Sequence, residues 1–201
     1  MPEPVVISAA VEGLLDEVVV RRLIEHAGGS PGPVFGKEGK QALRDKIGGY
    51  NNAAQHTPWF VLVDLNGDAD CAPPLRQTWL AAPAPRLCFR VAVRQVEAWL
   101  MADREELAKY LSIARSRVPP APESLQNAKV EMVNLARRSR RKDVRADMVP
   151  RAGSGRSTGP AYVSRLIEYV QSHWRPAVAA QSAESLRKAI ACLQRLTGRA
   201  A

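Results

Sequence analysis

Three short apolar runs constrain the fold of this chain more than any other feature of its sequence. They are residues 4–10 (PVVISAA), 59–64 (WFVLVD) and 86–93 (RLCFRVAV). The first run has no polar face, which is typical of a strand buried on both sides in a parallel sheet. Parallel strands need long crossover connections, which are usually helices. The runs therefore predict an α/β fold in which a mostly parallel sheet is flanked by helices.

Helical patterns occupy the connections between these runs. From Leu14 to His26 the apolar residues recur at helical spacing, and Gly28-Gly29 ends the run. A minimal second strand is expected at Val34-Phe35. Further helices are expected at 37–48, at 73–80 and at 95–111, the last with an interruption near Asp103. Strand and helix thus alternate over roughly the first 112 residues, as in a Rossmann-like sheet.

The linker VPPAPESLQ (118–126) separates this pattern from a part of the chain with helical patterns only. Helices are expected there at 125–142, 160–174 and 182–196, with a loop at 149–160. The sequence therefore predicts an α/β domain over residues 1–117 and a C-terminal helical extension over residues 118–201. The extension is short, so we expect it to pack on the sheet domain.

The positive charge is concentrated in one segment. The chain carries a net charge of +9, and residues 129–165 hold ten basic residues against three acidic ones, which is seven of the nine net charges. A concentrated basic patch favours a polyanionic partner, and nucleic acid (DNA or RNA) is the commonest one. The alternative is a solvated basic helix that has no partner.

Arginines in the run LARRSRRKDVR (135–145) recur at helical spacing. On a continuous helix this spacing places Arg137, Arg141 and Arg145 on one face. Arg138 and Lys142 lie next to that face. Such a stripe can follow a phosphate backbone, and because it contains no aromatic residue, base stacking is not expected.

Two further segments combine basic residues with glycine. Lys37 and Lys40 lie beside two glycines in FGKEGKQAL, whose backbone amides could cradle a phosphate. The loop GSGRSTGP (153–160) precedes a helix and could bind phosphate together with Arg151 and Arg156. The alternatives are a solvated helix start and a linker loop. Neither segment is a P-loop or a GxGxxG motif, so no nucleotide cofactor is expected.

The cysteines and the apolar runs bear on the compartment. Cys71, Cys88 and Cys192 lack the CxxC spacing, which argues against a zinc site and against a disulfide framework. We therefore expect the three cysteines to stand apart, without pairing with one another. No apolar run approaches the ~20 residues needed to span a bilayer. The N-terminus carries acidic residues and lacks a basic leader. We therefore expect a cytoplasmic protein that does not bind membranes.

Acidic residues follow two of the expected strands. Glu12 follows the first strand and Asp64 ends the central one, while Asp16 lies one helical turn beyond Glu12 and points back toward it. Ligands of open parallel sheets bind beyond the carboxyl ends of the strands. Carboxylates gathered there are best neutralised by a cation such as Mg²⁺ or Mn²⁺. The alternative is that the strand surfaces into a polar turn, a position that Asp68 and Asp70 favour.

These motifs together resemble a known family. An EG-x-x-D element (Glu12 to Asp16) is followed by an apolar strand that ends in D-L-N (Asp64 to Asn66) and by R-x-x-E-A-W around Glu97. The combination resembles the TOPRIM fold of topoisomerases, primases and the overcoming-lysogenization-defect (OLD) nucleases. The similarity is greatest to small TOPRIM-like proteins related to the OLD group, and it covers about the first 105 residues.

The resemblance implies a metal centre and phosphodiester chemistry. It marks Glu12, Asp16 and Asp64 as ligands of one or two Mg²⁺ ions, with Asn66 at the position of the family's second aspartate. Asp68 or Asp70 could substitute for that aspartate if the loop folds back. The resemblance assigns catalysis to Glu12, Asp64 and Glu97, and a lysine, with Lys129 and Lys142 as candidates, stabilises developing charge.

Two functions of different classes follow from the resemblance. The first is a metal-dependent nuclease that acts in phage defence or as a toxin. The resemblance also implies a separately encoded ATPase as its partner, because this chain has no ATP-binding motif. The second is a nucleic-acid-binding or adaptor protein with impaired catalysis. Asn66 favours the second, because an amide ligates Mg²⁺ without bringing a negative charge.

Overall fold

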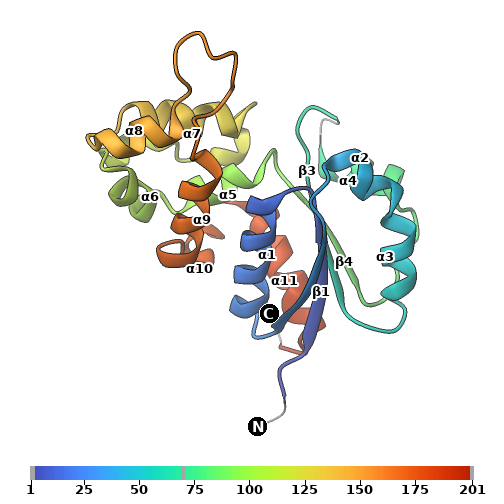
Figure 1. The fold of residues 1–201 in the computed structure, drawn as a ribbon. Helices are drawn as coiled ribbons and strands as arrows, with labels where there is room; N and C mark the ends of the chain where they lie inside the picture. Colours follow the sequence, from blue (N-terminus) through green and yellow to red (C-terminus); the bar gives the residue numbers. More distant parts are fainter. Residues whose placement is uncertain (1–2, 69–70, 200–201) are drawn as a thin grey trace. The chain divides into compact units, whose positions relative to one another are not determined.

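The computed structural model describes residues 3–68 and 71–199, and it confirms the α/β fold (Figure 1). The sheet has four strands in the order β2-β1-β3-β4. All three strand pairings are parallel. The strands are β1 (Val6–Val11), β2 (Ser30–Gly36), β3 (Trp59–Asp64) and β4 (Leu87–Ala92).

The chain forms two compact units. The first, here called the sheet unit, comprises Met1–Val93 and Ser185–Ala201, and the second, the helical unit, comprises Arg94–Glu184. The expected boundary at residue 117 therefore differs from the observed one at Val93. The reason is that the helices after β4 pack with the later helices, while the last helix packs on the sheet.

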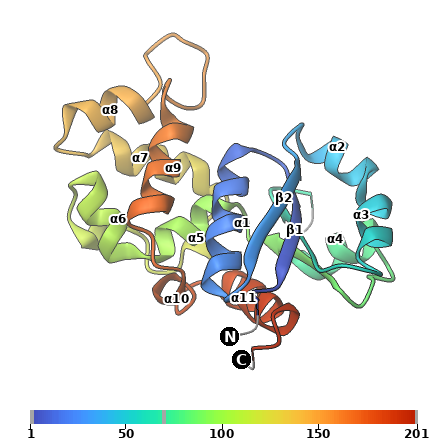
Figure 2. The same cartoon turned by 60° about the horizontal axis from the view of Figure 1, so that its bottom comes forward.

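Helices cover both faces of the sheet (Figures 1 and 2). One face carries α1 and α11, and the other carries α2, α3 and α4. On the second face Leu43, Tyr50 and Trp79 are buried against Val61 and Phe89 of the sheet. The helix bounds are α1 (Leu14–His26), α2 (Lys40–Asp45), α3 (Ile47–Ala53), α4 (Ala72–Trp79) and α11 (Glu184–Leu196).

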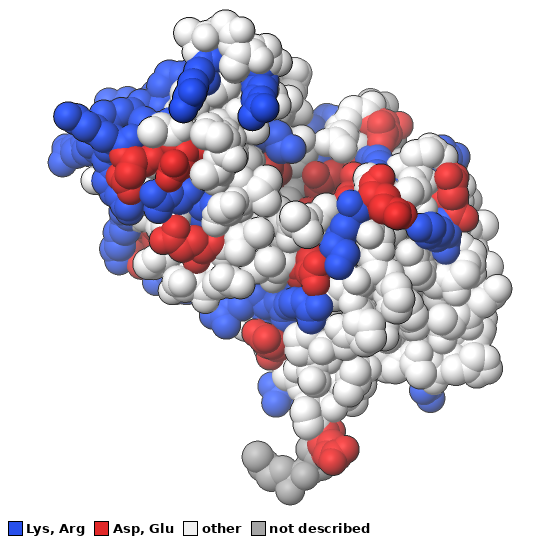
Figure 3. Space-filling model, in the orientation of Figure 1, with Lys and Arg blue, Asp and Glu red and all other residues white. Residues whose placement is uncertain are grey.

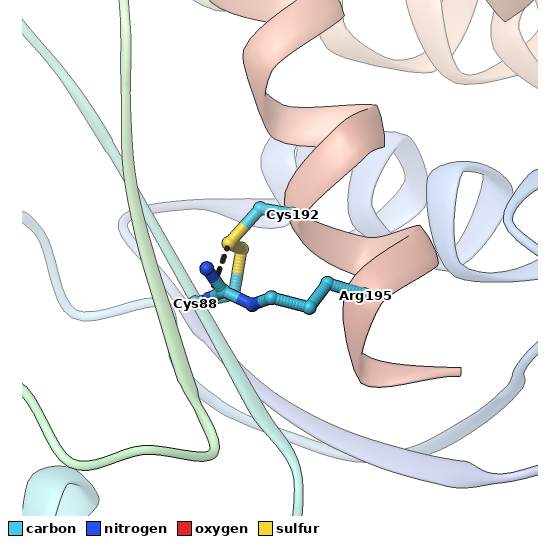
Figure 4. Close-up of a disulfide and its surroundings, with 3 residues drawn as sticks. All are labelled: Cys88, Cys192 and Arg195. Atoms are coloured by element: carbon cyan, nitrogen blue, oxygen red, sulfur yellow. Dashed lines mark hydrogen bonds between the residues drawn. A yellow bond between two sulfur atoms is a disulfide. The ribbon is translucent and has the colours of Figure 1, made fainter. Parts of the chain in front are cut away.

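A disulfide fixes α11 to the sheet unit. It joins Cys88 in β4 to Cys192 in α11, 104 residues apart in the sequence (Figure 4). The expectation that all three cysteines stand apart is therefore corrected, and of the three only Cys71 is free. Sequence spacing alone did not indicate this pairing, because the two cysteines meet only once the last helix has folded onto the sheet.

The helical unit is built around two buried tryptophans. Trp99 and Trp174 are fully buried, and the indole N–H of Trp174 donates to the carbonyl oxygen of Trp99 at 3.2 Å. The interruption expected near Asp103 is confirmed, because one helix ends at Ala102 and the next begins at Arg104. The helices are α5 (Val96–Ala102), α6 (Arg104–Leu111), α7 (Ala128–Arg137), α8 (Lys142–Met148), α9 (Tyr162–Ser172) and α10 (Pro176–Ala179).

The helix expected over 125–142 is broken, and this corrects the arginine stripe. The buried Ser139 accepts a hydrogen bond from the backbone N–H of Arg141 at 3.0 Å, and its carbonyl oxygen accepts one from the Arg145 guanidinium. These contacts turn the chain between α7 and α8. Arg137 ends one helix and Arg145 lies in the next, so they do not share one helical face.

Two elements of the sheet unit also differ from expectation. The second strand is longer than Val34-Phe35, and it contains Pro31 and Pro33 because β2 is an edge strand where missing donors are tolerated. The helix expected at 37–48 is divided into α2 and α3 near Lys46.

Within the described residues, no helix is both long and apolar enough to cross a bilayer.

Gly36 provides a test of the packing between β1 and β2. Its φ is +84°, and a methyl group there would overlap with the carbonyl oxygen of Val11. We expect Gly36→Ala to lower the free energy of unfolding by about 2–3 kcal/mol, measured by urea denaturation. The control is Gly48→Ala in α3, where nothing lies within 4 Å and alanine favours the helix by about 1 kcal/mol. Equal stability of the two variants would contradict the prediction.

Candidate functional site

The ends of β1 and β3 bring two acidic residues together, as expected. The strands pair in parallel, with Ala10 beside Val61. Glu12 follows β1, and its carboxylate oxygen Oε1 accepts a hydrogen bond of 2.7 Å from the backbone N–H of Asp64. The prediction that Glu12 and Asp64 lie at the same edge of the sheet is confirmed. The hydrogen bond holds the Glu12 carboxylate against the end of the neighbouring strand.

Asp16 is folded back toward this edge by the first turn of α1. Gly13 is the residue before the helix, and its backbone is extended. Oδ2 of Asp16 lies 3.5 Å from the position that a Cβ atom on Gly13 would occupy. The Asp16 carboxylate therefore lies beside Gly13, the residue that follows Glu12. That it points toward Glu12 itself stays a prediction. The acidic group also lies in the first turn of the helix, where a negative charge is stabilised.

Asn66 occupies a turn that explains its residue type. Its φ is +51°, in the left-handed region, and the backbone N–H of Asp68 donates to the Leu65 carbonyl oxygen at 3.2 Å. Asparagine is one of the few residues that adopt this conformation at little cost. The backbone conformation of the turn therefore accounts for an asparagine at position 66, whether or not its side chain also binds a ligand. Asp70 lies outside the described residues.

Lys40 brings a positive charge to the same edge. Its ammonium group donates to the carbonyl oxygen of Asp64 and lies 2.5 Å from Oδ2 of Asp68. Expected as a phosphate-binding residue, Lys40 is instead engaged with the acidic turn. It also lines an open hollow of about 550 Å³ between α2 and α4. The lining residues are Lys40, Gln41, Arg44, Asp68, Pro74, Leu75, Thr78 and Trp79.

The oxygen donors at this edge are of the kind that Mg²⁺ prefers in proteins. Over residues 3–68 and 71–199, no three His, Cys, Asp or Glu side chains lie close enough together to hold a metal. Mg²⁺ differs from Ca²⁺ in keeping several water ligands, and it is commonly held by one or two carboxylates together with substrate phosphate. Glu12 and Asp64 supply two such carboxylates on adjacent strands. The donor chemistry is therefore that of a two-carboxylate site.

Lys37 is held within the sheet unit by an acidic partner. Its ammonium lies 3.0 Å from Oε2 of Glu17, which also pairs with Arg21 at 2.8 Å. Partial burial raises the pKa of Glu17, but the hydrogen bonds from Arg21 and Lys37 outweigh burial and hold the pKa below its ordinary value. Lys37 thus stabilises the start of α1, in addition to any contact with phosphate.

The helical unit brings together two residues that the sequence marked separately. Glu97 in α5 is only 2% exposed, and the Lys129 ammonium of α7 lies 3.9 Å from its Oε1 atom. The same oxygen accepts a hydrogen bond of 3.1 Å from the hydroxyl of Tyr162. Tyr162 is 65 residues from Glu97, so no local signal in the sequence could have indicated it. The catalytic roles of Glu97 and Lys129 stay predictions.

A basic surface covers α7, α8 and the turn between them (Figure 3). Within the described part of the chain, no carboxylate forms an ion pair with Arg138, Arg140 or Lys142. Arg141, by contrast, pairs with Asp143 at 2.6 Å. The exposed basic residues there are Arg137, Arg138, Arg140, Arg141 and Lys142. The surface retains most of its positive charge even though the single-face stripe does not form.

The loop after α8 forms a second basic feature of the helical unit. Arg151 and Arg156 line an open hollow of about 400 Å³, together with Ser154, Thr158 and Pro160. Arginine guanidinium groups and hydroxyl groups are donors that bind phosphate oxygens well. The loop therefore has the donor set that the sequence predicted for it.

Comparison with protein-family models, with curated proteins and with solved structures finds no match to this chain.

Proposed function

We propose that this chain is a metal-dependent phosphodiesterase that cleaves nucleic acid, of the kind implied by its resemblance to OLD-like TOPRIM nucleases. The observation that carries the proposal is the 2.7 Å hydrogen bond between the Glu12 carboxylate and the Asp64 backbone N–H. It holds two acidic residues of adjacent strands at the edge where ligands of parallel sheets bind.

The side chains at this edge have distinct roles in the proposal. Mg²⁺ or Mn²⁺ bound there supplies an activated water and neutralises charge on the phosphate. Glu12 and Asp64 hold the ion through their carboxylates, and Asp16 adds negative charge from the first turn of α1. The hydrogen bond from the Asp64 N–H fixes the position of the Glu12 carboxylate at this edge.

The basic surface of the helical unit binds the nucleic acid. Arg138, Arg140 and Lys142 are exposed and without acidic partners in the part of the chain that the structure describes. Their contacts are with phosphate, so binding weakens steeply as salt concentration rises and depends little on sequence. The proposed setting is cytoplasmic phage defence or toxicity, beside a separately encoded ATPase.

A cleavage assay tests this function. Linear double-stranded DNA, single-stranded DNA and RNA are incubated with the purified protein in Mg²⁺, in Mn²⁺ and in EDTA. We expect cleavage of at least one substrate with metal and none with EDTA. Intact substrates under all metal conditions, with a correctly folded protein, would contradict the proposal.

A second candidate is a nucleic-acid-binding or adaptor protein with impaired catalysis. Lys40 favours it, because its ammonium already pairs with Asp68 where a metal ion would otherwise recruit that carboxylate. Asn66 favours it as well, since it brings no negative charge. Calorimetric titration with Mn²⁺ separates the two functions, because only the nuclease needs to bind metal at millimolar concentration or below.

Lys40→Met is expected to tighten Mn²⁺ binding by about tenfold, because it removes one positive charge and frees the Asp68 carboxylate. Isothermal titration calorimetry measures the effect. The control is Lys46→Met, which removes the same charge from an exposed pair with Glu38. Unchanged affinity in Lys40→Met, or an equal gain in the control, would show that Lys40 does not compete with the metal.

A further inference from the structure

Three arginines of the sheet unit lie near enough to one another at the edge strand β4 for the charges of two to act on the third. Arg90 lies in β4, Arg76 in α4 and Arg195 in α11. Among the described residues, no carboxylate forms an ion pair with any of the three. Some arginines of the chain are paired, as Arg165 is with Asp147 at 2.7 Å. The three arginines at β4 lack such ion pairs among the described residues.

The fold itself brings two of the arginines together. Arg90 follows Cys88 by two residues, so both side chains point to the same face of β4. Cys88 is bonded to Cys192, and the guanidinium of Arg195 donates to the Cys192 sulfur at 3.5 Å (Figure 4). Because the disulfide fixes α11 to β4, Arg195 is held beside the strand that carries Arg90.

Two of these guanidinium groups have buried donors that are not satisfied. The Nε atoms of Arg76 and Arg90 are inaccessible to solvent and have no hydrogen-bond partner within the described structure. Folded proteins rarely leave buried donors unpaired, because each has lost its water without gaining an acceptor. The unpaired Nε donors therefore distinguish Arg76 and Arg90 from the ion-paired arginines of the chain.

The charges of the cluster act on one another. Burial, together with the nearby charges of Arg76 and Arg195, lowers the pKa of Arg90 to about 10. Arg90 therefore remains positive at neutral pH. Like charges gathered in a partly buried place are unfavourable unless an anion neutralises them.

We propose that Arg76, Arg90 and Arg195 form a binding site for a phosphate dianion, either inorganic phosphate or the terminal phosphate of a phosphomonoester. Each guanidinium presents a planar fork of donors that matches two phosphate oxygens. A tetrahedral dianion offers enough oxygens for three forks and two negative charges, whereas a carboxylate offers two oxygens and one charge. The site uses none of the acidic residues assigned to cleavage, so it goes beyond the proposed function.

The test measures binding rather than cleavage, so its outcome does not depend on nuclease activity. Calorimetry and thermal unfolding are recorded for wild type, Arg90→Gln and Arg86→Gln at constant ionic strength. Arg86→Gln removes the same charge from an exposed arginine just before β4, whose guanidinium donates to the His56 carbonyl oxygen. The ligands are inorganic phosphate, a 5′-mononucleotide, and oligonucleotides with a 5′-phosphate or a 5′-hydroxyl.

We expect wild type and Arg86→Gln to bind phosphate, and Arg90→Gln to bind it at least about tenfold more weakly. Without ligand, Arg90→Gln should be as stable as wild type or more so, because a repulsive charge is gone. Preference for the 5′-phosphorylated oligonucleotide would identify a nucleic-acid end as the source, and preference for inorganic phosphate or the mononucleotide a small molecule; both support the site. No binding by wild type, or equal binding by Arg90→Gln, would overturn it.

Discussion

Replacing Asp103 by alanine is expected to lower the free energy of unfolding of the helical unit by about 3–5 kcal/mol. Asp103 is fully buried between α5 and α6. Its carboxylate accepts two hydrogen bonds from the Arg175 guanidinium, at 2.7 and 2.9 Å, and one from the Arg175 backbone N–H at 3.1 Å. It also caps α6 by accepting from the backbone N–H of Glu106. Alanine removes all four acceptor contacts. Urea denaturation followed by tryptophan fluorescence measures the loss.

Two further variants separate the causes of this loss. Asp103→Asn keeps an oxygen for the helix cap and removes the charge, so about half of the stability should be retained. Glu105→Gln removes an exposed carboxylate that pairs with the same arginine at 3.2 Å, and it should change stability little. If Glu105→Gln were as destabilising as Asp103→Ala, burial of Asp103 would not be the cause.

The sheet could be predicted from the sequence because its strands are short apolar runs bounded by helical patterns. The second run, residues 59–64, matches β3, and the helix from Leu14 to His26 matches α1. The break between α7 and α8 could not be predicted, because it depends on hydrogen bonds that Ser139 makes once the chain has turned. Helical periodicity continues through Ser139 in the sequence and gives no sign of the break.

The meeting of Glu12 and Asp64 could be predicted because parallel strands bring their carboxyl ends to one edge. The pairing of Lys40 with Asp68 could not, since the two are separated by β3 and its connections and no periodicity links them. A signal for the arginine cluster was present: Arg90 is a charged residue inside an apolar strand, on the same face as Cys88. Its neighbours Arg76 and Arg195 come from distant helices, so the cluster itself is visible only in the folded chain.

Replacing Asp64 by asparagine is expected to reduce metal-dependent cleavage by at least about 100-fold. The substitution keeps the size of the side chain and the backbone N–H that donates to Glu12, so the end of β3 keeps its shape. It removes one of the two negative charges that hold the ion in the proposed metal site. Initial cleavage rates at saturating Mn²⁺ measure the effect, and calorimetry should show Mn²⁺ binding weakened in parallel.

The matched control is Asp45→Asn, which removes the same charge from the exposed last residue of α2, where the Asp45 carboxylate accepts from the Gln41 side chain. Its cleavage rate should equal that of wild type. Glu12→Gln keeps an acceptor for the Asp64 N–H but not the charge, so it should lose activity as Asp64→Asn does. Cleavage that persists in both Asp64→Asn and Glu12→Gln would place the chemistry elsewhere. Loss in both, with unchanged thermal unfolding, would assign it to the carboxylates at the ends of β1 and β3.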